Sequence, residues 1–153
     1  MATDYDAKAL SLAAANARSN LHGRERAAFS TAELRWGRRI PDALLDPDIV
    51  IGADLTYVRD AWPALAQTLR DLRAPALIAA TERRANEVLS LQSYLAAAGL
   101  PSSPMDLPPS SRGYAAERVK VLSINRARDD ERCSFWTVDD ELAPESVLAV
   151  RCT

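Results

Sequence analysis

Histidine and cysteine are scarce in this sequence. His22 is the single histidine, and Cys133 and Cys152 are the two cysteines. A zinc site or a histidine-based catalytic triad needs several such side chains close together. Two cysteines without metal-ligand spacing are also too few for a disulfide framework. We therefore expect no metal centre and no nucleophile triad, and a reducing compartment, which is the cytoplasm or alternatively the nucleus.

The chain also lacks an excess of one charge and a long apolar run. Its 19 basic and 21 acidic residues give a formal net charge of -2 over 153 residues. A nucleic-acid-binding surface would need a concentrated basic face, and a membrane span would need about 18 consecutive apolar residues. The N-terminus, MATDYDAKAL, has no basic segment followed by an apolar one, so we expect no secretory signal. These absences predict a globular protein without a nucleic-acid or membrane partner, and they leave its oligomeric state open.

Helical patterns are clear in a chain whose length suits a single domain, residues 1–153. Asp6 can cap a helix over 7–20, which is rich in alanine and leucine. A second helix is predicted at 61–72, with Pro63 in its first turn and an apolar face formed by leucines. A third is predicted within 86–100, where Gly99 acts as the C-terminal stop.

Strand patterns alternate with these helices. Unalternated apolar runs at 48–53 and 76–81 are typical of strands covered on both faces. The remaining expectations are a short strand at 32–36, an antiparallel hairpin made from 118–127 and 132–138, a short strand at 146–150, and a loop in the proline- and serine-rich segment 101–113.

This order of elements predicts an α/β sheet that is parallel at first and antiparallel at the end. In open α/β sheets, ligands bind beyond the carboxyl ends of the parallel strands. Asp54 lies at one such end, Thr81 lies at another, and Tyr57 follows Asp54 by three residues. These residues therefore form a candidate site, although their chemistry is not defined by position alone.

Each candidate residue also has a purely structural interpretation. Asp4 can be a carboxylate at a helix entry, stabilised by the helix dipole. Trp36 can be a core side chain, Asp54 a turn residue and Tyr57 a rim aromatic. The charged run Glu82, Arg83 and Arg84 is most simply a solvated strand exit, although Glu82 could face the site.

Several segments in order resemble one enzyme family: ATDYDAKALSLAAANARSN, LRWG, IVIGADLTY and IAATERR. Together they resemble the seven-β-strand (class I) methyltransferases, and more narrowly their lysine-methyltransferase-like group with a D-x-x-Y signature. The resemblance extends to about residue 100. APALIAATERR also resembles the elongation-factor-2 lysine methyltransferase branch, but Arg84 stands where that branch often has asparagine.

The resemblance implies S-adenosylmethionine as cofactor and assigns roles to five residues. Asp4 matches the acidic residue that binds the ribose hydroxyls, Trp36 matches the tryptophan near the adenine, and Ala53 matches the small residue beside the cofactor. Asp54 and Tyr57 match the pair that borders the acceptor amine. The implied partner is a protein substrate, with a translation factor as one candidate. A small-molecule N-methyltransferase of the nicotinamide type and a non-catalytic binding module remain alternatives.

The sequence departs from this family at its front. A class I methyltransferase begins with a strand and a glycine-rich turn, whereas the five glycines here have no G-x-G spacing. Asp4 already matches the tip of the family's second strand. We therefore expect an N-terminally truncated domain that lacks the first strand, which would lie between the second and fourth strands of the sheet.

Overall fold

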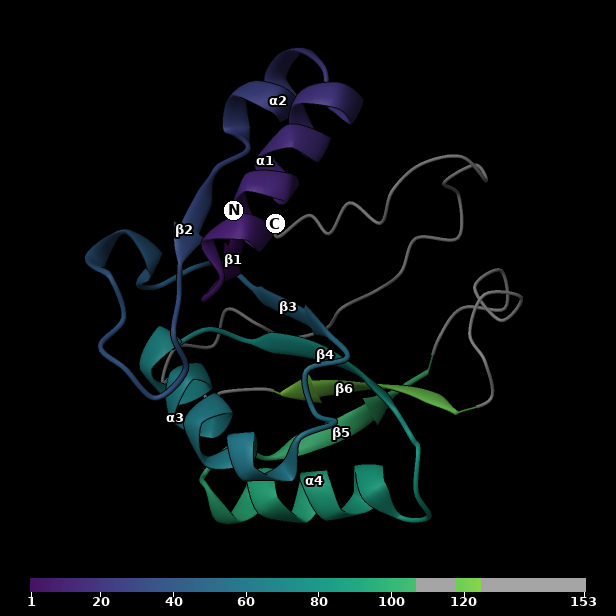
Figure 1. Cartoon of the computed structure of the whole chain (residues 1–153). Helices are drawn as coiled ribbons and strands as arrows, with labels where there is room; N and C mark the ends of the chain where they lie inside the picture. The colour runs from purple at the N-terminus through teal and green to yellow at the C-terminus, as the bar shows by residue number, and fades with distance from the viewer. Residues whose placement is uncertain (107–117, 125–153) are drawn as a thin grey trace.

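The computed structural model describes residues 1–106 and 118–124 (Figure 1). The described elements are β1 (Ala2–Asp4), α1 (Ala7–Asn20), α2 (Gly23–Ala28), β2 (Thr31–Glu33), the 3-10 turn η1 (Asp42–Leu44), β3 (Val50–Ala53), the 3-10 turn η2 (Arg59–Ala61), α3 (Trp62–Leu72), β4 (Ala76–Thr81), α4 (Glu87–Ala97), β5 (Ser102–Met105) and β6 (Val119–Ile124).

The strands form two separate sheets. In the smaller one, β1 and β2 are parallel, with Asp4 opposite Glu33. The larger sheet has the order β3-β4-β6-β5, in which β3 and β4 are parallel and β6 is antiparallel to both β4 and β5. This confirms the predicted α/β sheet with parallel strands first and an antiparallel pair last.

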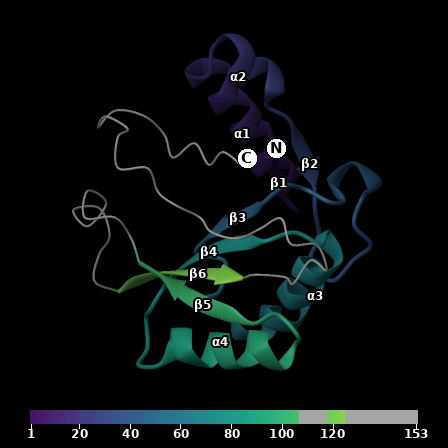
Figure 2. The ribbon, with the colours of Figure 1, turned by 180° about the vertical axis from the view of Figure 1, so that it is seen from behind.

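A break separates the two sheets. Within the described part of the chain, β1 pairs only with β2 and β3 only with β4, so β1 and β3 each keep one unpaired edge. Figures 1 and 2 show the smaller sheet with α1 and α2 at one end of the molecule and the larger sheet with α3 and α4 at the other.

Local signals explain where the helices begin and end. Asp6 caps α1 by accepting a hydrogen bond from the Lys8 backbone N–H at 2.9 Å. Pro63 lies in the first turn of α3, where its missing N–H costs no intrahelical bond. Gly99 follows α4 at a φ of +77°, a left-handed conformation that favours glycine. The predictions of these three helices are confirmed.

The larger sheet is well covered on one face. Figures 1 and 2 show α3 and α4 on the same side of it, and the alternate β4 residues Ala76, Ile78 and Ala80 are each 1% exposed. On the opposite face Ile51 of β3 is 69% exposed. The prediction that β3 is covered on both faces is therefore wrong, because a continuous apolar run does not reveal whether a second layer packs on it.

Two further predictions change. The segment 101–113 was expected to be a loop, but Ser102–Met105 forms β5, and Pro104 is tolerated there because β5 is an edge strand. The strand expected at 32–36 is Thr31–Glu33, and Trp36 lies in a turn after it. The predicted strands at 132–138 and 146–150, like both cysteines, lie outside the described residues.

The hydrophobic core has two parts. The main cluster lies between the larger sheet and the two helices, and includes Leu69 of α3, Leu91 of α4 and Leu122 of β6. A second cluster contains Leu34, Ile40, Leu44 and Leu72, with Val50 packed against it. It connects the segment that follows β2 to α3 and β3. No helix in the described residues is both long and apolar enough to cross a membrane.

Candidate functional site

Asp54 begins a tight turn at the carboxyl end of β3. Its backbone N–H donates to the Ala79 carbonyl at 2.9 Å, which continues the pairing with β4 by one residue. Its φ is +55°, a left-handed conformation that aspartate adopts more readily than most residues. The strand therefore ends here, and the carboxylate lies at the edge of the sheet.

Apolar contacts with the core and one buried hydrogen bond fix the turn that follows β3, residues 54–57. Leu55 packs against the main core, and Thr56 is 4% exposed. The Trp62 indole N–H at the start of α3 donates to the Thr56 carbonyl at 2.9 Å. These contacts hold Leu55 and Thr56 in place, while Asp54 and Tyr57 on either side of them face solvent; Tyr57 is 60% exposed.

Asp54 and Tyr57 meet around one cation, the Arg83 guanidinium. Arg83 Nη2 donates to Asp54 Oδ1 at 2.7 Å and to Oδ2 at 2.8 Å. The Arg83 Cζ atom also lies 5.6 Å from the centroid of the Tyr57 ring, within the range of a cation–π contact. A carboxylate and an aromatic ring thus contact the same positive charge, which is an arrangement suited to binding a cationic side chain.

The segment that carries Arg83 is anchored by a buried carboxylate. Glu87, the first residue of α4, is 5% exposed. Its Oε2 accepts hydrogen bonds from the backbone N–H groups of Arg83 at 2.9 Å and Arg84 at 3.2 Å. The bond from Arg83, followed by the one from Arg84, lowers the pKa of Glu87 despite the opposing effect of burial.

Asp4 lies at the carboxyl end of β1 and is half-buried. Its Oδ1 accepts a hydrogen bond from the Asp6 backbone N–H at 2.9 Å, so Asp4 shapes the entry to α1. Its Oδ2 has no hydrogen-bond partner within the described ranges 1–106 and 118–124. The interpretation of Asp4 as a helix-entry carboxylate therefore agrees with the structure. Its second carboxylate oxygen remains available for a ligand hydroxyl.

Trp36 and Ala53 have different surroundings. Trp36 is half-buried and packs against the main core, while the Gly37 N–H next to it donates to Thr68 Oγ1 of α3 at 3.0 Å. Ala53 is the last residue of β3, opposite Ala79, and is exposed. Asp4 and Ala53 thus lie at the carboxyl ends of the two strands next to the break, and Trp36 lies against α3.

These residues fit one part of S-adenosylmethionine and not another. Asp4 offers a carboxylate oxygen for ribose hydroxyls, and Trp36 a partly exposed ring for the adenine. For the methionine part the chain has no G-x-G sequence whose backbone could approach it. Only the nucleoside side of the cofactor therefore has candidate residues in this chain.

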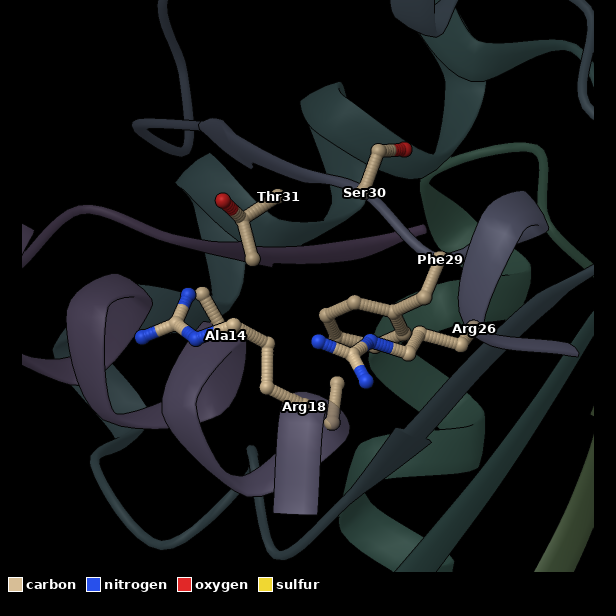
Figure 3. A pocket seen from close by; sticks show the side chains of 7 residues that line it. Ala14, Arg18, Arg26, Phe29, Ser30 and Thr31 are labelled. Carbon is tan, nitrogen blue, oxygen red and sulfur yellow. The ribbon is translucent and has the colours of Figure 1, made fainter. Parts of the chain in front are cut away.

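A pocket of about 270 Å³ lies elsewhere, between α1 and the α2–β2 segment (Figure 3). Its lining includes Arg18, Arg26, Phe29 and Thr31. None of the five predicted site residues lines it, and its lining contains no carboxylate, histidine or cysteine. It is therefore not the candidate site.

Arg83 is the residue that the sequence interpretation missed. The run Glu82, Arg83 and Arg84 was interpreted as a solvated strand exit, with Glu82 as its best candidate for the site. The available signal was topological: β3 and β4 are parallel, so the residues after each strand emerge at the same edge of the sheet. That rule brings the end of β4 beside Asp54.

Comparison with known proteins gives one family. The family model described as lysine methyltransferase matches residues 1–94, which include every predicted site residue and Arg83. No curated protein matches the chain.

Proposed function

The chain belongs to the lysine methyltransferase family, and from this premise we propose that it methylates a lysine side chain of a protein. Membership makes the chain a methyltransferase of the class I fold and implies S-adenosylmethionine as the methyl donor. The protein-lysine acceptor and the roles of Asp54 and Tyr57 are our proposal. A translation factor is the acceptor that the narrower resemblance suggests, with the cytoplasm as the compartment.

One observation carries the acceptor assignment: Asp54 and Tyr57 already hold a side-chain cation in this structure, the guanidinium of Arg83. A lysine ammonium carries the same charge and makes the same two kinds of contact, a charge-assisted hydrogen bond and a cation–π contact. The Asp54 side chain is 52% exposed, and Tyr57 is also exposed. A site this open suits a side chain presented by a protein.

Methyl transfer to an amine requires Asp54 and Tyr57 mainly to position the acceptor. A lysine ammonium with a pKa near ~10.4 must lose a proton before its nitrogen can attack. At this exposed edge of the sheet the proton passes to water. When bound, S-adenosylmethionine supplies an electrophilic methyl group on its sulfonium. Asp54 would hold the acceptor nitrogen and take its hydrogen bond, and the Tyr57 ring would direct the side chain toward the edge of the sheet. Holding the acceptor nitrogen in line with the methyl group can by itself lower a large part of the activation barrier.

The test combines a transfer assay with donor binding. The full chain is incubated with radiolabelled S-adenosylmethionine and either lysate proteins or small amines such as nicotinamide. We expect label in protein. Label only in small amines would favour the nicotinamide-type alternative, and no calorimetric heat with S-adenosylmethionine or its product would favour a non-catalytic module.

Asp54→Asn is the variant that tests the acceptor role. Asparagine tolerates the left-handed φ of this position but lacks the charge. We expect turnover to fall by about tenfold to a hundredfold with little change in donor affinity, because one charged contact to the acceptor is lost. Asp42→Asn is the matched control, since Asp42 is also exposed and paired with an arginine, Arg39. Equal losses of turnover and donor affinity in Asp54→Asn would show that Asp54 is structural.

A further inference from the structure

Arg83 occupies the position in which an acceptor cation would bind. Its guanidinium contacts both oxygens of Asp54 and faces the ring of Tyr57. Within the described part of the chain its side chain makes no other hydrogen bond, ion pair or ring contact. The Arg83 side chain therefore contacts only residues of the proposed acceptor site within the described residues.

The Arg83 side chain can leave this position without disturbing the fold. Its main chain is held independently, because its backbone N–H donates to the buried carboxylate of Glu87. The side chain is 43% exposed and is attached through several rotatable bonds. Release of the guanidinium breaks an exposed ion pair and leaves the β4–α4 connection in place.

Asp54 in turn does not need Arg83 to keep its position. Its backbone is fixed to Ala79 by a hydrogen bond. Of the two residues directly after it, Leu55 is partly buried against the main core, and Thr56 is buried and accepts the Trp62 hydrogen bond. A residue that only positions Asp54 would add little to these contacts. The guanidinium instead neutralises the carboxylate and covers the ring that would attract a substrate cation.

We propose that Arg83 is an internal competitor for the acceptor cation and so lowers the affinity of the site for free cationic ligands. The inference rests on the proposed function, in which a lysine side chain binds Asp54 and Tyr57. The acceptor must displace Arg83 before its nitrogen can reach the edge of the sheet. Displacement of Arg83 costs every cationic acceptor the same free energy. A free amine must meet that cost with its own contacts, whereas a lysine on a docked protein is supplied at high local concentration. Arg83 therefore weakens the binding of small amines that make no other contact with the chain.

The test measures binding of a lysine mimic without requiring methyl transfer. Nα-acetyl-lysine methylamide is titrated into the isotope-labelled full chain, and the NMR shifts of the Asp54 and Tyr57 amides report its Kd. Arg83→Gln keeps an unbranched polar side chain and removes the competing charge. We expect its Kd for the mimic to fall by roughly twofold to sixfold relative to the unmodified chain, which is the range of one exposed ion pair. Arg84→Gln is the matched control, with the same loss of charge one residue away, and its Kd should stay within about 1.5-fold.

The double variant Arg83→Gln with Asp54→Asn should lose the gain, because Asp54 is the group that is uncovered. An unchanged or weaker Kd in Arg83→Gln would overturn the proposal, and so would absence of binding by every variant. Steady-state kinetics give a second readout: Arg83→Gln should lower the KM for the acceptor with little change in kcat, whereas a fall in kcat would indicate a positioning role. If Arg83→Gln binds the mimic more tightly but no variant transfers a methyl group, the proposed function fails and the competition stands. If methyl transfer occurs but Arg83→Gln does not bind the mimic more tightly, only the competition fails.

Discussion

The backbone of Asp54 explains why two interpretations of this residue agree with the structure. Its φ of +55° makes it a turn residue, as local sequence alone suggests. The same turn directs its carboxylate to the edge of the sheet, where it meets Arg83 at 2.7 Å. A short polar side chain that tolerates the left-handed region can serve both purposes, and a β-branched residue could serve neither.

Gly52 supports the turn from within β3. A Cβ atom at this position would clash with Leu55 Cδ1 and lie 3.1 Å from Ile78 Cδ1. A side chain at residue 52 would therefore force the Leu55 side chain to move.

We accordingly expect Gly52→Ala to lower the free energy of unfolding by about 1–3 kcal/mol through overpacking. Urea denaturation followed by circular dichroism would measure this. In a Leu55→Ala background the same substitution should cost less, since the clashing methyl is gone. Equal costs in both backgrounds would mean that Leu55 is not the obstacle.

At the scale of elements, the β4–α4 connection depends on the first residue of α4. Glu87 ties two consecutive backbone N–H groups, those of Arg83 and Arg84, to the start of the helix. Its position in the first turn also suits the positive end of the helix dipole. The connection that presents Arg83 is thereby fixed by a carboxylate that does not take part in the site.

The lowered pKa of Glu87 makes this anchor sensitive to acid. A carboxyl group whose folded pKa lies below its ordinary value of 4.5 contributes stability that is complete above that value and is lost as the pH falls through the folded pKa. We expect Glu87→Gln to reduce stability at pH 7 and to flatten the decline in stability below about pH 4.5. Urea midpoints measured between pH 7 and pH 3 would show this.

Glu25→Gln is the matched control for this prediction. Glu25 is an exposed acidic residue in the first turn of α2 and has no hydrogen bond to the backbone within the described residues. It should leave the pH profile of the urea midpoint unchanged. A Glu87→Gln profile parallel to that of the unmodified chain would contradict the proposed anchoring by its charge.

At the scale of the whole molecule, a small apolar cluster helps to join the two sheets, together with Trp36 and the hydrogen bond between Gly37 and Thr68. Leu34 and Leu44 come from the segment after β2, and Leu72 ends α3. No backbone pairing between the sheets is present in the described ranges, since β1 and β3 pair only with β2 and β4. The relative position of Asp4 and Asp54 therefore depends on side-chain packing in this cluster.

We expect Leu72→Ala to lower the free energy of unfolding by about 2–5 kcal/mol, because Leu72 is 5% exposed and its truncation leaves a cavity. Amide hydrogen exchange should show the greatest loss of protection in β1 and β2, which the cluster ties to the larger sheet. Leu45→Ala is the control, since Leu45 is 44% exposed and should cost less than about 1 kcal/mol. A uniform loss of protection across both sheets would show that they unfold as one unit.

The sequence by itself determined the elements whose signals are local. The cap at Asp6, the proline in the first turn of α3 and the glycine after α4 define the helices, because each acts on the backbone within one turn. The run of β4 was read residue for residue as Ala76–Thr81. The resemblance to lysine methyltransferases was likewise visible in short sequence segments, and the family match over residues 1–94 supports it.

Only the tertiary structure decided which of these elements meet. Strand pairing made β5 out of a proline- and serine-rich segment, and packing left one face of β3 exposed. The contact between Arg83 and Asp54 joins residues 29 positions apart. Such contacts depend on sheet order and register, which are set by the burial of whole faces and not by neighbouring residues. The sequence could thus place Asp54 at a strand end, while the fold alone supplied the cation beside it.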